Sequence, residues 1–404
     1  MKINRLRLLI CYICVFIPLL IFWYALMDNV VHKLDITGVD GYKISTDAYT
    51  LNPNLEVLLA KDVAERVLDA RISWQEQAPL PNGIYYKDQV AVLMYHHLIG
   101  EPVSLAPGVL TAGQFDEHMQ LLKQEGFQVI TMKHYRQFML ENAPVPDNAV
   151  LLTFDDGYES FYRLAFPILQ KHGYTAANFI IASDVDHPDG RKVPKLTWEQ
   201  MREMKSAGMS FYNHTYNLHY YGIVDAEGGT RPAASNLLYI NDENRNELNE
   251  EYYRRVIGDL AQAERRLKEE LNNTDSAIAF PYGSFNDRLL EASSSLGIDL
   301  RFSIREGLSS RMTPVAPRIN KGDSTLTPAQ FIEPLKHAEP LMEMTVNSSK
   351  VPLAWTQPQL RDGVLLVPLS PLCKVLGIEM DYDQDTRTLK LTPGGLGTDD
   401  VTLK

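Results

Sequence analysis

The sequence predicts an α/β fold whose core is a mainly parallel sheet, either a β/α barrel or a doubly wound sheet. Short apolar runs alternate with stretches of helical periodicity between residues 89 and 339. The apolar runs are almost continuous, which is typical of parallel strands buried on both faces. Polar motifs stand where several of these runs end, and such folds carry their functional sites at the carboxyl ends of the strands.

Five runs are predicted to be buried strands, at residues 90–95, 150–154, 177–182, 277–280 and 300–304. Helices are predicted between them, at residues 111–125, 158–172, 197–207, 247–271 and 287–296. The third of these helices has the clearest end signals, because Thr197 and Gln200 form a capping box and Gly208 follows its last turn.

The composition is that of a globular protein and excludes several classes. Of the 404 residues, 45% are hydrophobic and 22% are charged, which argues against wholesale disorder. Asp and Glu number 51 against 39 Lys and Arg, a net charge of −12, so we expect no nucleic-acid partner. The three cysteines, Cys11, Cys14 and Cys373, are too few for a disulfide framework or a thiolate zinc cluster.

The N-terminal segment predicts a membrane anchor. Residues 8–27 carry no charge, and about 20 apolar residues suffice to cross a bilayer as a helix. Lys2, Arg5 and Arg7 precede this run, which places the N-terminus in the cytoplasm and the rest of the chain outside it. A cleaved signal peptide is the alternative, but the run ends in Ala-Leu-Met, a poor cleavage site. In either case we expect the bulk of the protein to be extracytoplasmic, and with the uncleaved anchor it is a single-pass protein of the cell membrane.

The chain is predicted to have four parts. Residues 1–27 form the anchor, and residues 28–88 form a spacer with one helix at about residues 60–75. Residues 89–339 form the α/β domain. Residues 340–404, which contain short strands and turns, form a separate small α+β domain.

The strongest functional signal is a pair of aspartates, Asp155 and Asp156, followed by Gly157. A buried strand runs directly into these carboxylates, and the turn at Gly157 can aim both at one cavity. Two ionised carboxylates side by side are unfavourable unless a cation lies beside them. An isolated Asp-Asp-Gly would be interpreted as a turn, because Asp-Gly is a common turn dipeptide.

A pair of histidines, His214 and His219, follows a strand predicted at residues 209–213. Two imidazoles on one loop can bind a metal, with a carboxylate as the third ligand and an open position for water. A lone histidine is more often a structural residue. A histidine pair and an aspartate pair at strand ends of one sheet together predict a metal centre.

Two further motifs end predicted strands. His96 and His97 follow the strand at residues 90–95, and a Pro-Tyr-Gly turn that contains Tyr282 follows the strand at residues 277–280. Because the carboxyl ends of parallel strands meet at one edge, all four motifs are expected on the same face of the fold.

Together these motifs resemble those of the polysaccharide deacetylases, the NodB-homology family of carbohydrate esterases. They are Thr-Phe-Asp-Asp-Gly at residues 153–157, His-Thr-x-x-x-His at residues 214–219 and Phe-Pro-Tyr-Gly at residues 280–283. The resemblance covers about residues 90–338 and implies a barrel-like deacetylase domain. The five-residue histidine spacing and the early Tyr-His-His resemble the branch that deacetylates poly-β-1,6-N-acetylglucosamine of biofilm matrix.

The resemblance implies a role for each motif residue. Asp155 is expected to be the catalytic base, and Asp156, His214 and His219 are expected to be the metal ligands. The backbone N–H of Tyr282 is expected to contact the oxyanion.

The general acid and the partner of the base depart from the common family pattern. The late Leu-x-x-His motif that supplies the acid in much of the family is not clearly present, so the early His96 is the first candidate and His337 the second. Many members also tether the base with an arginine shortly before Pro-Tyr-Gly, which this chain lacks. Arg318 is the candidate substitute, although it could equally form a surface ion pair.

These residues predict metal-dependent hydrolysis of N-acetyl groups on an extracellular N-acetylglucosamine polymer, most readily poly-β-1,6-N-acetylglucosamine. Zn²⁺ is the first choice of metal, and Co²⁺, Ni²⁺ or Fe²⁺ suit the same donors. Three alternatives stay open: a peptidoglycan N-acetylglucosamine deacetylase, a non-catalytic glycan-binding surface protein and an Fe(II) oxygenase. The last fits poorly, because the carboxylate and first histidine of such triads usually lie close together in sequence.

The C-terminal part resembles the small domain named after the N-terminal region of copper amine oxidases. The matching segments are residues 361–369, 376–377 and 381–383. Residues 351–404 contain no histidine, so no copper is expected there. We expect this part to serve in attachment or spacing at the cell surface.

Overall fold

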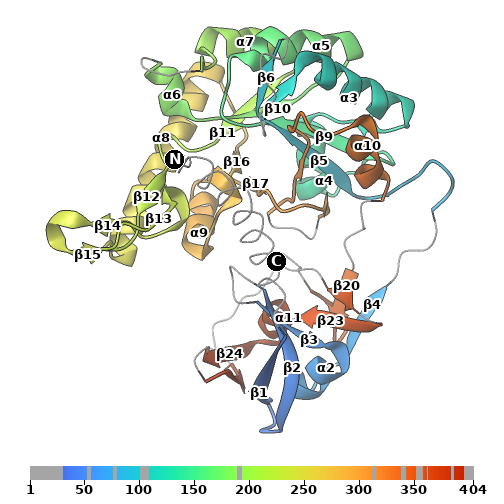
Figure 1. Ribbon diagram of the computed structural model, residues 1–404, viewed down its shortest axis with the longest axis vertical. Helices are drawn as coiled ribbons and strands as arrows, with labels where there is room; N and C mark the ends of the chain where they lie inside the picture. Colours follow the sequence, from blue (N-terminus) through green and yellow to red (C-terminus); the bar gives the residue numbers. More distant parts are fainter. Residues whose placement is uncertain are drawn as a thin grey trace, which may run out of the picture. The chain divides into compact units, whose positions relative to one another are not determined.

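The computed structural model describes residues 31–51, 56–75, 80–100, 109–188, 193–311, 315–337, 343–351, 358–361, 363–383 and 386–394. The chain divides into two compact units, which Figure 1 shows in ribbon form. One unit contains residues 78–341, and the other combines residues 1–77 with residues 342–404.

The unit at residues 78–341 is built on a mainly parallel sheet. Its parallel strands follow one another in space as β17 (Leu300–Phe302), β16 (Ala277–Ala279), β11 (Ser210–Asn213), β10 (Ala177–Ile180), β9 (Ala149–Phe154) and β5 (Val90–Tyr95). The short strands β8 (Gln128–Val129) and β18 (Leu308–Ser309) pair with β9 and β5. The six parallel strands therefore end at the same edge, where the sequence motifs stand.

Residues 316–320 join the two ends of this sheet. Ala316 pairs with Phe302 of β17, and β19 (Ile319–Asn320) pairs in parallel with β5 through Ile319 and Leu93. One segment thus contacts both the first and the last parallel strand. The result is a mixed α/β fold with a curled sheet, in agreement with the barrel-like domain predicted from the sequence.

Both faces of the strands are buried, which explains the continuous apolar runs. In β5, Leu93 and Tyr95 pack with the helices outside the sheet, whereas Val90 and Val92 pack with Tyr135 in a second cluster. Alternation along the strand sends successive side chains to opposite faces, so a strand covered on both sides must be apolar throughout.

Helices cover the outside of the sheet, with α3, α5 and α7 forming a row in Figure 1. The helices of this unit are α3 (Ala112–Gln124), α4 (Met132–Glu141), α5 (Phe166–His172), α6 (Ala182–Asp186), α7 (Trp198–Ser206), α8 (Asn249–Leu271), α9 (Asp287–Ser295) and α10 (Pro328–Lys336). Between β11 and α8 the chain forms two small hairpins, β12 (Tyr221–Ile223) with β13 (Thr230–Pro232) and β14 (Tyr239–Ile240) with β15 (Arg245–Asn246). The capping box at Thr197 and Gln200 is present at the start of α7.

The second unit is a seven-stranded sheet made from both ends of the chain. Its order is β22 (Gln359–Arg361), β23 (Val364–Pro368), β3 (Glu56–Ala60), β2 (Lys43–Leu51), β1 (Val31–Thr37), β25 (Thr388–Pro393) and β24 (Ile378–Asp383). Helices α2 (Lys61–Leu68) and α11 (Leu369–Leu376) contribute to its core, and β4 (Ile72–Gln75) pairs with β20 (Glu343–Val346) in a separate small sheet.

This arrangement differs from the predicted layout. Residues 31–75 supply strands and a helix rather than a spacer, and residues 343–394 share their sheet rather than forming a separate domain. The predicted helix at residues 60–75 ends at Leu68, and Ile72 begins a strand. The physical reason is burial, since apolar side chains of the first segment, such as Leu34, pack in one core with C-terminal side chains such as Val367.

No helix among the described residues is long and apolar enough to span a bilayer. The anchor predicted at residues 8–27 lies outside the described part of the chain.

Candidate metal centre and active site

The strand-end motifs converge as the parallel topology requires. β9 leads into Asp155 and Asp156, and β11, two strands along the sheet, leads into His214 and His219. One ligating atom from each of Asp156, His214 and His219 lies within 4.8 Å of the other two. The Nε2 atoms of His214 and His219 are 3.4 Å and 3.3 Å from Asp156 Oδ1.

The donor atoms of this triad fit a divalent metal. Asp156 Oδ1 is buried and has no hydrogen-bond partner among the described residues, an unfavourable state unless a cation occupies the site. His214 Nδ1 is 2.7 Å from the carbonyl oxygen of Ala279, which fixes the proton on Nδ1 and leaves Nε2 free to bind a metal. Two imidazoles and one carboxylate are a common set for catalytic zinc.

The electrostatics of the triad follow from its burial and its charges. Burial opposes ionisation of Asp156, but the neighbouring imidazoles outweigh it and hold the pKa of that carboxyl well below its usual range. Burial also opposes the charged form of His214, yet the carboxylates of Asp155 and Asp156 raise its pKa. Burial, reinforced by the charge of His214, lowers the pKa of His219 to about 4, so His219 is neutral near pH 7, as a metal ligand must be.

Asp156 sits in a left-handed backbone conformation that a second segment holds in place. Its φ is 70°, and that of Gly157 is 64°. The Lys195 ammonium donates to the carbonyl oxygen of Asp156 at 2.8 Å, and the Leu196 amide donates to that of Gly157 at 2.8 Å. Because a non-glycine residue rarely adopts positive φ without support, these bonds explain how the ligand is positioned.

Lys195 is itself enclosed by polar and aromatic partners. Its ammonium lies 3.3 Å from Asp184 Oδ2 and 4.0 Å from the centre of the Tyr158 ring. Both charged side chains of the Lys195–Asp184 pair are buried. Lys195 thus places a fixed positive charge next to the peptide of a metal ligand.

Asp155 is held quite differently, by a bidentate ion pair with Arg318. Arg318 Nη1 and Nη2 donate to Asp155 Oδ1 and Oδ2, each at 2.7 Å, and Nε donates to the carbonyl oxygen of Ser303 at 2.8 Å. Burial opposes ionisation of Asp155, but Arg318 and the nearby imidazoles outweigh it and hold its pKa below the usual value. Arg318 lies in the segment that closes the sheet, which brings it to a carboxylate 163 positions away in sequence.

The candidate general acids occupy different surroundings. His96 Nε2 lies 4.0 Å from Asp155 Oδ2, and a third of the His96 side chain is exposed. His97 contacts a different residue, because its Nδ1 lies 2.9 Å from the Ser160 hydroxyl. His337 lies at the C-terminal end of α10, with its side chain 78% exposed and 3.5 Å from Glu333. The structure therefore brings His96, but not His97, close to Asp155, the residue predicted to be the base.

A partly buried aspartate on α8 fixes the loop between the two histidines. Asp259 accepts hydrogen bonds from the backbone N–H groups of Tyr216 and Asn217, both at 2.8 Å. Burial raises the pKa of Asp259 to about 6. The same loop is tied at its start, where the Thr215 amide donates to Asn213 Oδ1 at 2.7 Å.

The Pro-Tyr-Gly turn places an aromatic ring on the metal triad. Tyr282 has φ 57°, and its ring centre is 4.5 Å from that of His219. Tyr221 of β12 contacts Tyr282 in turn, with ring centres 4.6 Å apart and the ring planes tilted by 58°. The three rings form a series that leads away from the triad.

A pocket of about 350 Å³ opens beside the ligands. Its lining includes Asp156, Tyr158, Asp184, Lys195, His219 and Tyr220. The site is therefore an open depression with charged, hydroxyl and aromatic groups near a metal position, which suits a polar substrate.

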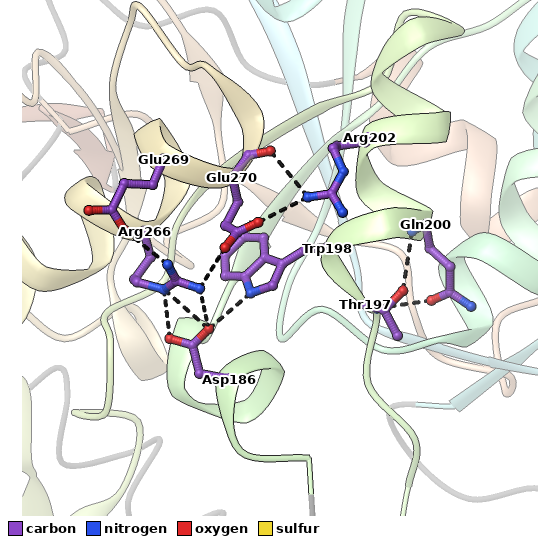
Figure 2. A network of polar contacts seen from close by, with 8 residues as sticks. All are labelled: Asp186, Thr197, Trp198, Gln200, Arg202, Arg266, Glu269 and Glu270. Carbon is purple, nitrogen blue, oxygen red and sulfur yellow. Dashed lines mark hydrogen bonds and ion pairs between the residues drawn. The ribbon is translucent and has the colours of Figure 1, made fainter.

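An ion-pair network fixes α6, which carries Asp184 into this pocket. Figure 2 shows Asp186, at the end of α6, between Arg266 of α8 and Trp198 of α7. Arg266 Nε is 2.9 Å from Asp186 Oδ2, and Trp198 Nε1 donates to Asp186 Oδ1 at 2.9 Å. Glu270 extends the network to Arg202. Three helices are thus joined behind the pocket wall.

Comparison with known proteins now assigns this unit. Residues 142–300 match the polysaccharide deacetylase family. The chain contains a polysaccharide deacetylase domain. It resembles a solved de-N-acetylase from Aggregatibacter actinomycetemcomitans with a TM-score of 0.57 and 26% identity, over 61% of this chain and 100% of that one.

Two curated relatives carry the same name, poly-β-1,6-N-acetyl-D-glucosamine N-deacetylase. The Escherichia coli protein is 32% identical over 204 residues, which are 48% of this chain and 30% of the relative. The Staphylococcus aureus protein is 23% identical over 240 residues, which are 56% of this chain and 76% of the relative. The match thus covers less than a third of the Escherichia coli protein.

Several residues of the deacetylase site were not found from the sequence. Lys195, Asp184 and Asp259 are single charged residues on a loop, a short helix and a long helix, without a spacing that marks them. Tyr221 lies in a three-residue strand within an insertion that shows no periodicity. A lysine directly before the capped helix at Thr197 was the one available signal, and it is too common to be informative.

Proposed function

We propose that the deacetylase domain hydrolyses the N-acetyl groups of an N-acetylglucosamine polymer, with a divalent metal held by Asp156, His214 and His219. The observation that carries the proposal is the contrast between two adjacent buried carboxylates. Asp156 faces two imidazoles, whereas Asp155 is ion-paired with Arg318 and stays out of the ligand set. A ligand beside a separate base is the arrangement that metal-assisted hydrolysis requires.

The ligand set favours Zn²⁺, and Co²⁺, Ni²⁺ and Fe²⁺ accept the same donors. Such a metal supplies Lewis-acid activation of water and of the acetyl carbonyl. Asp156, His214 and His219 hold it through one carboxylate oxygen and two imidazole nitrogens.

Three residues of this chain then transfer protons or stabilise the developing negative charge. Asp155, kept ionised by Arg318, accepts the proton of the attacking water. The backbone N–H of Tyr282 donates to the oxygen on which negative charge develops. His96, 4.0 Å from Asp155, donates a proton to the departing nitrogen as the C–N bond breaks, so the products are acetate and a free amine.

The substrate we propose is poly-β-1,6-N-acetylglucosamine, an extracellular biofilm polymer. The names of the Escherichia coli and Staphylococcus aureus relatives support it, and so does the five-residue spacing of His214 and His219. The polar, open pocket beside the ligands is compatible with a sugar chain.

Acetate release tests the proposal. The chain, loaded with Zn²⁺, is incubated with poly-β-1,6-N-acetylglucosamine and, separately, with peptidoglycan. We expect acetate and new amines from the first polymer, and loss of both after chelation, with recovery when Zn²⁺ is returned. Activity on peptidoglycan alone would change the substrate, and no acetate from either polymer would contradict the proposal.

We also propose that residues 8–27 anchor the domain on the outer face of the cell membrane. The support is the uncharged run itself and the basic residues Lys2, Arg5 and Arg7 before it. The full chain should then fractionate with membranes and resist high salt. Recovery from cells of a mature N-terminus close to Met27 would instead establish a cleaved signal.

A further inference from the structure

Exposed apolar side chains gather around the metal triad. Among the large apolar residues that are exposed in the described part of the chain, four have contacts that place them there. Val193 and Tyr220 line the pocket, the Tyr221 ring contacts the Tyr282 ring at a tilted angle, and Ile304 lies against Gly283. Exposed apolar groups that cluster at a polar active site indicate a ligand with an apolar face.

The side formed by Tyr221, Tyr282 and Ile304 is here called the aromatic platform. Tyr221 is 54% exposed and Ile304 is 48% exposed, so neither is part of the core. The Tyr221 ring lies 4.6 Å from the Tyr282 ring, which lies 4.5 Å from the ring of the ligand His219. The platform is therefore continuous with the metal site.

The backbone beneath the platform is fixed. Tyr221 pairs with Pro232 in the hairpin of β12 and β13, and the Ala233 amide donates to the carbonyl oxygen of Tyr220 at 2.9 Å. A side chain at Gly283 would collide with Ile304 Cγ1 and with the Ile304 amide nitrogen. Glycine at this position lets Ile304 pack directly on the turn that carries Tyr282.

A fixed, solvent-facing aromatic surface loses little entropy when a flat apolar group covers it. A pyranose ring offers such a face, because its axial C–H groups lie on one side while its hydroxyl groups point outward. A sugar polymer whose acetamide occupies the metal site also needs a surface for its neighbouring residue. The ring series from His219 to Tyr221 supplies such a surface.

We propose that the aromatic platform binds the pyranose ring next to the residue being deacetylated, with Tyr221 as its main contact. This rests on the function proposed above, because it takes the reacting residue to be part of a glycan chain. Tyr221 then acts on substrate binding and chain recognition rather than on the hydrolytic step.

The test compares two substrates that share the acetyl chemistry. One is a defined β-1,6-linked N-acetylglucosamine tetramer, and the other is an activated aryl acetate with no sugar. For Tyr221→Ala we expect the ratio of kcat/KM on the tetramer to kcat/KM on the aryl acetate to fall about tenfold, mainly through KM. Tyr221→Trp should recover most of that ratio, because an indole offers a similar surface.

Tyr42→Ala is the matched control, since Tyr42 is an exposed tyrosine of the other unit and should leave the ratio unchanged. Metal content, measured in parallel, should equal that of the unmodified chain for every variant. An unchanged ratio in Tyr221→Ala, or an equal loss on both substrates, would overturn the platform. Absence of acetate release by the unmodified chain would instead contradict the proposed function.

Discussion

Asp155 and Asp156 are neighbours in sequence, are both buried, and end in different electrostatic environments. The region around Asp155 neutralises its carboxylate within the protein, through two 2.7 Å bonds from Arg318. The region around Asp156 offers two imidazole nitrogens and leaves Oδ1 without a hydrogen bond among the described residues. The Asp155 carboxylate thus has its counter-charge within the protein, whereas the Asp156 carboxylate would gain one from a bound cation.

The difference shows how one turn can provide both a base and a metal ligand. The positive φ of Asp156 turns the backbone directly after the strand, and the side chains of Asp155 and Asp156 contact different partners. A base that also bound the metal would be a weaker proton acceptor, because the metal charge would compete for its lone pairs.

The largest expected effect comes from the ligands on the Asp156 side. His214→Ala and His219→Ala each remove one of the three protein donors, so metal content and acetate release should both fall to background. Elemental analysis of the purified variants, together with an acetate assay, measures this. Stoichiometric metal and normal turnover in either variant would show that the site is wrongly assigned.

The Asp155 side should behave in the opposite way. Asp155→Asn keeps the ligand set and should retain the metal, while turnover falls by about 10²–10⁴-fold because the base is lost. Asp156→Asn is the paired variant and should lose metal. If the metal instead disappears from Asp155→Asn and stays in Asp156→Asn, the roles of the two aspartates are reversed.

His96 extends the Asp155 side toward solvent. His96→Ala should leave metal content intact and lower turnover by about 10²–10⁴-fold, because the departing nitrogen loses its proton donor. His97→Ala is the control, because His97 bonds to Ser160. If His337→Ala loses its turnover while His96→Ala keeps it, the general acid is His337, at the C-terminal end of α10. That outcome would also weaken the assignment to the biofilm-polymer branch.

The strand-end half of this site was predictable, since each motif directly follows a short apolar run of the kind typical of strands buried on both faces. Arg318 could be predicted only as a candidate partner of Asp155, because the contact between them depends on residues 316–320, which close the sheet. Lys195 and Asp259 could not be found, because their partners are backbone groups that carry no residue-specific signal.

The same reasoning explains the error outside the deacetylase domain. The strands at residues 31–60 pair with one another, and the outer two, β1 and β3, also pair with β25 and β23, more than 300 residues away along the chain. The apolar periodicity of this segment is weak, which is why the sequence predicted a spacer. Its pairing with the C-terminal strands leaves no local signal, so the shared sheet could not be predicted from the sequence.

Arg318 tests whether Asp155 is indeed neutralised within the protein. Arg318→Met leaves a buried carboxylate without its guanidinium, so the free energy of unfolding should fall by about 3–5 kcal/mol. Denaturant unfolding measures this at neutral pH. The double variant Asp155→Asn with Arg318→Met should recover part of the loss, and an additive effect of the two changes would show that the pair is not coupled.

The smallest expected effect concerns the support of Asp156. Lys195→Met removes the hydrogen bond to the Asp156 carbonyl oxygen that helps to hold the ligand at φ 70°. Partners that orient a ligand typically contribute about 10–100-fold to metal affinity, so the Zn²⁺ dissociation constant should rise by that factor. Competition with a chromophoric chelator measures this constant without an activity assay.

Lys171→Met is the matched control, because Lys171 pairs with Asp116 on the surface. If the two variants bind Zn²⁺ equally well, the turn after β9 holds its left-handed conformation without Lys195, and Gly157 together with the Leu196 amide accounts for the position of Asp156.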